Sequence, residues 1–99
     1  MRGSYKLIEK NSLKRDLKRI ARKYRDISEI LQAIDALEYS AYPDGWRKIV
    51  NLPKGKEALR VSVGDYRIIY SVNDKDKIVE VIHVFHRDET TYKNLIKRL

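Results

Sequence analysis

Two short segments of the chain alternate apolar and polar residues and are joined by a Gly-Asp pair. The apolar positions are Leu59, Val61 and Val63 in the first segment and Tyr66, Ile68, Tyr70 and Val72 in the second. Alternation with a period of two is typical of a strand with one buried face, and Gly64-Asp65 suits a two-residue primed turn. The pattern therefore predicts a β-hairpin in which Val63 pairs with Tyr66, Val61 with Ile68, and Arg60 with Ile69.

Before this hairpin, apolar residues recur every three or four positions, which predicts two helices. The first begins with Ser12 as its N-cap and ends at about Tyr24. Its apolar stripe is Leu13, Leu17, Ile20 and Tyr24. The second begins at Asp26, which forms a capping-box pattern with Glu29. Its inward residues are Ile27, Ile30, Leu31, Ile34 and Leu37. We expect the two helices to form an antiparallel hairpin that packs on the sheet.

The remaining segments predict short strands and one last helix. Residues 5–8 and 78–87 have the pattern of strands, residues 46–52 can form another, and Asp88 caps a helix near the C-terminus. The expected order is β-α-α-β-β-β-α, with a four-stranded, mainly antiparallel sheet. Antiparallel strands with segregated helices define an α+β fold. Residues 1–4 resemble the leader of an expression tag, so we expect residues 5–99 to form a single domain.

The composition is strongly basic, with 22 lysines and arginines against 14 acidic residues and a net charge of +8. This charge makes polyanions the natural class of partner. The outer face of the first predicted helix carries six cations: Lys14, Arg15, Lys18, Arg19, Arg22 and Lys23. The charged residues on the second helix are acidic, Asp35 and Glu38 among them, so the two helices can instead neutralise each other.

Several classes of site are excluded by the residues that the chain lacks. It contains no cysteine, which rules out disulfides, thiol nucleophiles and thiolate zinc sites. The two histidines, His83 and His86, lie three residues apart on a predicted strand and make a poor metal site, so we expect no metal and no cofactor. No apolar run approaches the roughly 18 residues of a membrane-spanning helix, and no signal peptide is evident. We therefore expect a soluble, cytoplasmic protein.

Arginines on one face of the predicted hairpin form the clearest candidate site. With the pairing given above, Arg60 and Arg67 share a face and are diagonal neighbours, roughly 7–8 Å apart. Like charges at this separation weaken a fold unless an anion lies between them. We therefore interpret the hairpin as half of an anion-binding site.

Three segments of the chain together resemble the RelE/ParE superfamily of bacterial and archaeal toxins. They are Val63-Gly-Asp-Tyr-Arg-Ile-Ile-Tyr70, the strand Val79-Glu-Val-Ile-His-Val-Phe-His-Arg87 with a following helix that bears Tyr92, and Trp46-Arg-Lys-Ile-Val-Asn-Leu-Pro-Lys-Gly-Lys56. RelE-type members are messenger-RNA endonucleases that act in the ribosomal A site through attack of a ribose 2′-hydroxyl. ParE-type relatives share the fold but poison DNA gyrase, so the site residues must decide between these functions.

The resemblance implies roles for particular residues of this chain. Arg60, Arg67 and Arg87 would stabilise the charge on the phosphorane, and Tyr92 would stack on the substrate or bond to it. The chain has Ala58, Arg60 and Ser62 where RelE enzymes alternate basic residues, so the usual lysine base has no counterpart. His86 is then our first candidate for the base, with His83 second. The candidate RNA-binding residues are Lys48, Lys54, Lys56, Ser62 and His83.

The partners implied by the resemblance are messenger RNA, the ribosome with its RNA, and a small acidic or amphipathic antitoxin. Lys54, Lys56 and the basic first helix would follow phosphate backbones without reading sequence. Two alternatives remain open: a ParE-like gyrase inhibitor, and a nucleic-acid-binding module without catalysis. The combination of Arg67, His86 and Arg87 disfavours the gyrase inhibitor, whereas the missing lysine favours the binding module.

Overall fold

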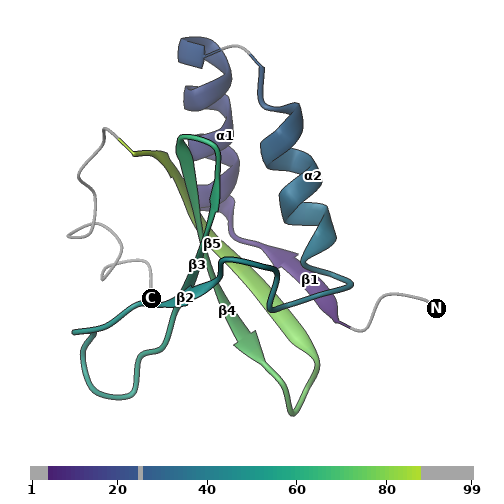
Figure 1. Cartoon of the computed structure of the whole chain (residues 1–99), viewed down its shortest axis with the longest axis vertical. Helices are drawn as coiled ribbons and strands as arrows, with labels where there is room; N and C mark the ends of the chain where they lie inside the picture. The colour runs from purple at the N-terminus through teal and green to yellow at the C-terminus, as the bar shows by residue number, and fades with distance from the viewer. Residues whose placement is uncertain (1–4, 25, 88–99) are drawn as a thin grey trace.

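The computed structural model of the protein describes residues 5–24 and 26–87. Two helices and five strands are found in these residues, in the order β1, α1, α2, β2, β3, β4 and β5 (Figure 1). The helices are α1 (Asn11–Tyr24) and α2 (Ser28–Ala36). The strands are β1 (Lys6–Glu9), β2 (Arg47–Lys48), β3 (Leu59–Val63), β4 (Tyr66–Asn73) and β5 (Ile78–His86).

The strands form one mixed sheet in the order β1-β5-β4-β3-β2. Strand β1 is parallel to β5, and the other three pairings are antiparallel. The two helices run side by side and pack on one face of this sheet (Figure 1). The predicted α+β class and the packed helical hairpin are confirmed. The described sheet has five strands, one at each segment with a strand pattern, whereas the expected order counted four.

Buried apolar residues form one cluster on each face of the sheet. The larger cluster fills the space between the sheet and the helices, and its most buried members include Leu13, Ile20, Ile30, Ile34, Leu37, Ile68, Tyr70, Val79 and Val81. The smaller cluster lies on the opposite face and consists of Ala58, Ile69, Ile82 and Phe85, with Ile49 and Leu52 packed against it. The loop between β2 and β3 therefore covers part of the face that the helices leave uncovered.

The predicted hairpin is confirmed in its turn and in its register. Val63 lies opposite Tyr66, Val61 opposite Ile68, and Arg60 opposite Ile69. Gly64 has a φ of 57°, the left-handed conformation that a primed turn requires at this position. The period-two pattern thus fixed both the strand pairing and the faces on which the side chains lie.

Four local predictions are wrong. Helix α1 begins at Asn11, so Ser12 lies inside the helix and is not its N-cap. Residues 46–52 form only the short β2, because Asn51 has a φ of 63° and Pro53 cannot donate to a ladder. Helix α2 begins at Ser28 with Ile27 in the N-cap position, while the Asp26 carboxylate accepts hydrogen bonds from the Ser28 amide (2.9 Å) and hydroxyl (2.7 Å). Leu31, expected to point inward, is 40% exposed. The predicted helix after Asp88 lies outside the described residues.

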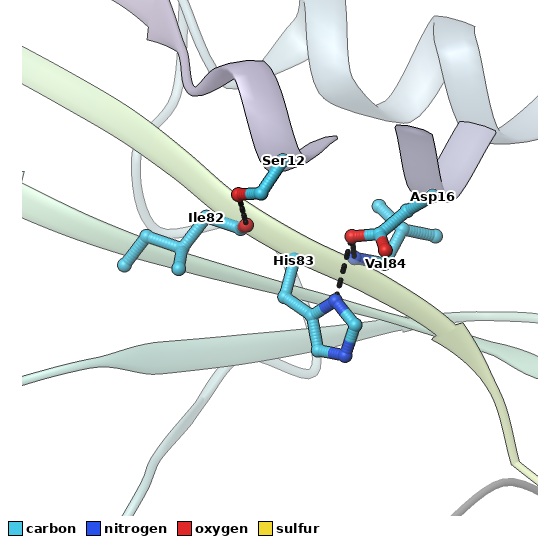
Figure 2. Close-up of polar contacts among 5 residues, drawn as sticks. All are labelled: Ser12, Asp16, Ile82, His83 and Val84. Atoms are coloured by element: carbon cyan, nitrogen blue, oxygen red, sulfur yellow. Dashed lines mark hydrogen bonds and ion pairs between the residues drawn. The ribbon is translucent and has the colours of Figure 1, made fainter. Parts of the chain in front are cut away.

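The edge of β5 is completed by side chains of α1 rather than by a further strand. Strand β1 ends opposite Val81. Beyond that point the Ser12 hydroxyl donates to the Ile82 carbonyl at 3.5 Å, and the Val84 amide donates to the Asp16 carboxylate at 3.3 Å. Figure 2 shows that the same carboxylate also meets the ring of His83, with an Oδ2–Nδ1 distance of 2.6 Å. Asp16 is 4% exposed and His83 is 2% exposed, so this is a buried contact.

A second carboxylate joins three segments at the other end of the sheet. Asp74, in the turn between β4 and β5, accepts hydrogen bonds from the hydroxyls of Tyr5 and Tyr42, each at 2.7 Å. These bonds lower the pKa of Asp74, and the bond to Asp74 raises the pKa of Tyr42 to about 12. The chain before β1, the loop after α2 and the β4–β5 turn are thereby held together.

We expect Asp16→Ala to lower the free energy of unfolding by about 1–3 kcal/mol, because it leaves the Val84 amide and the His83 ring without their buried acceptor. The measurement is urea denaturation followed by circular dichroism. Asp35→Ala, which removes an exposed carboxylate from α2, is the matched control and should change stability by no more than about 0.5 kcal/mol. Equal losses in the two variants would contradict a special role for Asp16.

We also expect the Tyr42–Asp74 contact to make stability depend on alkaline pH. The pKa of Tyr42 is raised in the folded state from 10 to about 12, so its contribution is complete below pH 10 and is lost as the pH rises toward 12. The thermal midpoint of the wild type should therefore fall more steeply over this range than that of Tyr42→Phe. Tyr39→Phe alters an exposed tyrosine and should retain the wild-type slope. Parallel curves for wild type and Tyr42→Phe would contradict the expectation.

Candidate nucleic-acid interface

The face of the sheet opposite the helices carries a row of cations. The register places Arg60 between Arg47 on β2 and Ile69 on β4, while Arg67 lies between Ser62 and Phe85. Paired residues share a face, so Arg47, Arg60 and Arg67 lie on one side and Arg60 has two cationic neighbours. Within residues 5–24 and 26–87, Arg60 and Arg67 form no ion pair with a carboxylate. Such an arrangement favours a bound anion.

Arg67 is held in place by the hairpin turn. Its Nη1 atom donates to the carbonyls of Gly64 (3.1 Å) and Tyr66 (3.0 Å). These contacts use one side of the planar guanidinium and leave Nε and Nη2 for another acceptor, since Arg67 makes no other polar contact with the part of the chain described. An arginine fixed in this way can bind a phosphate with two parallel hydrogen bonds.

Arg87 lies at the same end of the sheet as this turn. Its amide donates to the Asp65 carbonyl at 2.7 Å, and its Nε is 3.3 Å from the Asp65 carboxylate. The two side chains are 62% and 57% exposed, and an ion pair this exposed contributes only about 0–1 kcal/mol. The structure thus brings Arg67 and Arg87 to the same two-residue turn, but Arg87 already has an anionic neighbour that a phosphate must displace.

The structure does not bring His86 to the arginines. His86 lies opposite Tyr66, on the helix-covered face. There its ring stacks on Tyr24, with centroids 4.5 Å apart, and meets the edge of Tyr66 at 5.3 Å. The reason is the alternation of β5: Phe85 lies opposite Arg67 on the arginine face, so the next side chain points to the other side. His86, our first candidate for the base, therefore lies on the opposite face of the sheet from Arg60 and Arg67.

His83 is the histidine on the arginine side of the sheet. It lies opposite Ile69, in the same cross-strand row as Arg60, and its ring is 5.2 Å from that of Phe85. It is buried, however, and its Nδ1 is in contact with Asp16. Sequence reasoning missed Asp16, although its position three residues after Leu13 and four before Ile20 places it on the buried stripe of α1.

The other candidate residues are more scattered. Ser62 is exposed beside Arg67, and Lys54 and Lys56 are exposed in the loop between β2 and β3. Lys48 lies opposite Leu59, so the alternation of β2 directs Arg47 rather than Lys48 to the arginine face. Arg47 was missed because residues 46–52 alternate without showing which side meets the hairpin. Tyr92 lies outside the described residues.

A separate basic surface follows the exposed side of α1. A shallow hollow there is lined by Arg15, Lys18, Arg19, Arg22 and Lys23. Arg15, Lys18 and Arg22 form no ion pair with any carboxylate in the described residues, so mutual neutralisation of the two helices does not account for these three. The surface lies on the helix side of the sheet and is distinct from the arginine face.

Residues 5–24 and 26–87 contain neither a candidate metal site nor a candidate membrane span. No group of three or more histidine or acidic side chains there could hold a metal ion. No described helix is both long enough and apolar enough to cross a bilayer.

Comparison with known proteins identifies the family. Residues 8–91 match the family model described as the ParE toxin of the type II toxin-antitoxin system parDE. The chain belongs to this toxin family. The resemblance to the RelE/ParE superfamily is thus confirmed, and the protein is a toxin of a type II toxin–antitoxin system. No curated protein matches the chain.

Solved structures of RelE toxins have the same fold as this ParE-family toxin. The archaeal RelE–RelB complex from Pyrococcus horikoshii contains a chain with 26% identity and a TM-score of 0.68, and the match covers 88% of this chain and 99% of that one. The free Escherichia coli toxin RelE, a double arginine-to-alanine mutant, has 18% identity and a TM-score of 0.67, covering 97% and 98%. The toxin–antitoxin complex RelBE2 from Mycobacterium tuberculosis has 17% identity and a TM-score of 0.57, covering 90% and 98%.

The crowding of arginines predicts an unusual gain of stability. Arg60→Gln removes repulsion from Arg47 and Arg67, so we expect it to raise the free energy of unfolding by about 0.2–1 kcal/mol at low salt. The gain should shrink as salt screens the charges, and urea denaturation at two salt concentrations measures it. Lys75→Gln, in the exposed β4–β5 turn, is the control and should have little effect. A loss of stability in Arg60→Gln at low salt would show that repulsion among the three arginines does not destabilise the fold.

Proposed function

We propose that this toxin is an endoribonuclease that cleaves messenger RNA by attack of a ribose 2′-hydroxyl on the adjacent phosphate. The observation that carries the proposal is the pair Arg60 and Arg67, which share one face of the hairpin and have no carboxylate partner in the described residues. Nucleophilic attack turns a singly charged phosphodiester into a doubly charged phosphorane. Guanidinium groups fixed where that charge develops lower the barrier more than they stabilise the substrate.

Each arginine has a distinct part in this proposal. Arg67, held by the Gly64 and Tyr66 carbonyls, presents its free edge to the non-bridging phosphate oxygens. Arg60 supplies the second cation from the neighbouring strand. Arg87 contacts the phosphate once the phosphate displaces the Asp65 carboxylate from its guanidinium. The exposed Arg87–Asp65 ion pair is weak enough for this displacement.

Among the described residues, we assign electrostatic stabilisation but no proton transfer. His86 lies on the other face, and the ring of His83 is buried against Asp16. An arginine is a poor base because it remains protonated at neutral pH. Water then takes the proton of the 2′-hydroxyl as the 2′-oxygen bonds to phosphorus, and water protonates the 5′-oxygen as its bond to phosphorus breaks, leaving a 2′,3′-cyclic phosphate and a 5′-hydroxyl. The cleavage rate should therefore depend on the arginines and rise with pH, without the plateau that a histidine base would give.

We infer that the partners of the toxin are an antitoxin and the ribosome, in the cytoplasm. The family model describes a toxin of a type II toxin-antitoxin system, and the P. horikoshii relative was solved as a RelE–RelB complex. The basic face of α1 is a second surface that can bind an anion, and it lies on the side of the sheet away from Arg60 and Arg67. Two separate cationic surfaces suit an enzyme that binds ribosomal RNA with one and cleaves messenger RNA with the other.

Inhibition of DNA gyrase is a second candidate function. It is favoured by the burial of both histidines, which leaves the arginine face without an exposed imidazole in the described residues. In that case the cations would bind the enzyme or its DNA without cleaving RNA.

The two functions are separated by mapping messenger-RNA ends and DNA supercoiling after controlled expression. We expect cuts in translated messages that fall by about 100-fold or more in Arg67→Gln, the size of effect seen when one transition-state donor is removed. Lys75→Gln, which removes an exposed cation outside the site, should cleave like the wild type. Intact messages with altered supercoiling would overturn the nuclease proposal in favour of gyrase inhibition.

A further inference from the structure

The chain has a single tryptophan, and its side chain is exposed at the edge of the sheet. Trp46, which directly precedes β2, is 40% exposed. Its ring meets that of Tyr42 edge to face, with centroids 5.2 Å apart. Tyr42 is itself fixed by the 2.7 Å hydrogen bond from its hydroxyl to Asp74. The Tyr42 ring, fixed by Asp74, therefore packs against one side of the indole, while part of the indole surface faces solvent.

A small hollow opens beside this indole. Its volume is about 220 Å³, and it is lined by Tyr42, Trp46, Lys48, Glu57, Ala58, Leu59, Ser71, Val72 and Asp74. The hollow is smaller than the cavities of about 300–1,000 Å³ that hold drug-sized ligands, so it suits a single planar ring system. Both oxygens of Asp74 accept tyrosine hydroxyls, which leaves Glu57 and Lys48 as the charged groups that can meet the edge of such a ring.

Strand β2 connects this hollow to the arginine face. Arg47 lies opposite Arg60 on that face, whereas Lys48 points to the other side of β2. Lys48 lines the hollow together with Trp46, which directly precedes the strand. Arg47 and Lys48 are both exposed. A polyanion that passes from Arg60 across this edge of the sheet would therefore meet two further cations and then the indole.

We propose that Trp46 is a stacking platform for one base of the RNA whose phosphate is bound by Arg60 and Arg67. This inference rests on the proposed function, and it adds a binding subsite next to the cleavage position. Proteins that bind single strands combine cations along the backbone with exposed aromatic rings for the bases. Arg47 meets the RNA backbone on the arginine face, and Lys48 meets the phosphate of the stacked base on the other side of the strand. The base stacks on the indole, and the Glu57 carboxylate can accept a hydrogen bond from an exocyclic amine.

Intrinsic fluorescence provides a direct test, because Trp46 is the chain's single tryptophan. The probe is a short single-stranded RNA that is 2′-O-methylated throughout, so that it lacks the attacking hydroxyl and cannot be cleaved. We expect this RNA to quench the fluorescence of Trp46, and we expect the Arg60→Gln/Arg67→Gln variant to require a higher RNA concentration for the same quenching.

Substitutions measure how much the indole contributes to binding. In an anisotropy assay with the same labelled RNA, Trp46→Ala should weaken binding by about fivefold to 100-fold, the range found for loss of one base–aromatic stack. Trp46→Phe retains a ring and should retain part of the affinity. Tyr39→Ala removes another exposed aromatic residue, outside the hollow, and should bind like the wild type.

The outcomes separate this subsite from the nuclease itself. Unchanged fluorescence, or equal affinity of Trp46→Ala and wild type, would overturn the stacking platform even if Arg67→Gln abolishes messenger-RNA cleavage. Quenching by an antitoxin segment but not by RNA would also overturn it and assign the hollow to a protein partner. Quenching by RNA, together with intact messages in the expression experiment, would support the stacking subsite and overturn the proposed nuclease activity.

Discussion

The contact between the Asp16 carboxylate and β5 is the interaction on which the rest of the structure depends. The Asp16 carboxylate accepts a hydrogen bond from the Val84 amide and contacts the His83 ring (Figure 2). It thereby takes the place of a strand that would otherwise pair with this end of β5. An uncovered strand edge is a template for pairing with other chains, and a helix that supplies polar side chains to it removes that hazard. The same contact fixes the position of α1 on β5, because a shift of the helix would leave the Val84 amide without its buried acceptor.

The two faces of the sheet have opposite roles as a result. With α1 and α2 packed on one face, the apolar residues of β4 and β5 bury a continuous core there. The other face is covered only in part, by the loop that carries Ile49 and Leu52, and its remaining surface presents Arg47, Arg60 and Arg67. We expect the crowded cations to lower stability, which the buried core on the opposite side offsets. A site of this kind is expected where binding an anion matters more than local stability.

Much of this arrangement was predictable from local patterns, and the failures have physical causes. The hairpin register followed from alternation around Gly64-Asp65, which placed Arg60 and Arg67 on one face without any coordinates. Alternation along β5 places His86 and Phe85 on opposite faces, so His86 lies away from Arg67 once Phe85 is paired with Arg67. The pattern of β5 alone does not show which of its residues pairs with Arg67. Asp16 and Arg47 were missed because their importance comes from strands distant in the sequence, which periodicity within one segment cannot reveal.

The parallel pairing of β1 with β5 has a consequence for how the toxin is made. Lys6 lies beside Ile78 and Glu9 beside Val81, so the first strand finds its partner only after some seventy intervening residues. Contacts this distant along the chain slow folding, because a long loop must close before they form. The first strand therefore cannot pair until the residues of β5 have emerged from the ribosome. The arginine hairpin is therefore synthesised before the strand that joins it to β1. The folded toxin forms only after this delay.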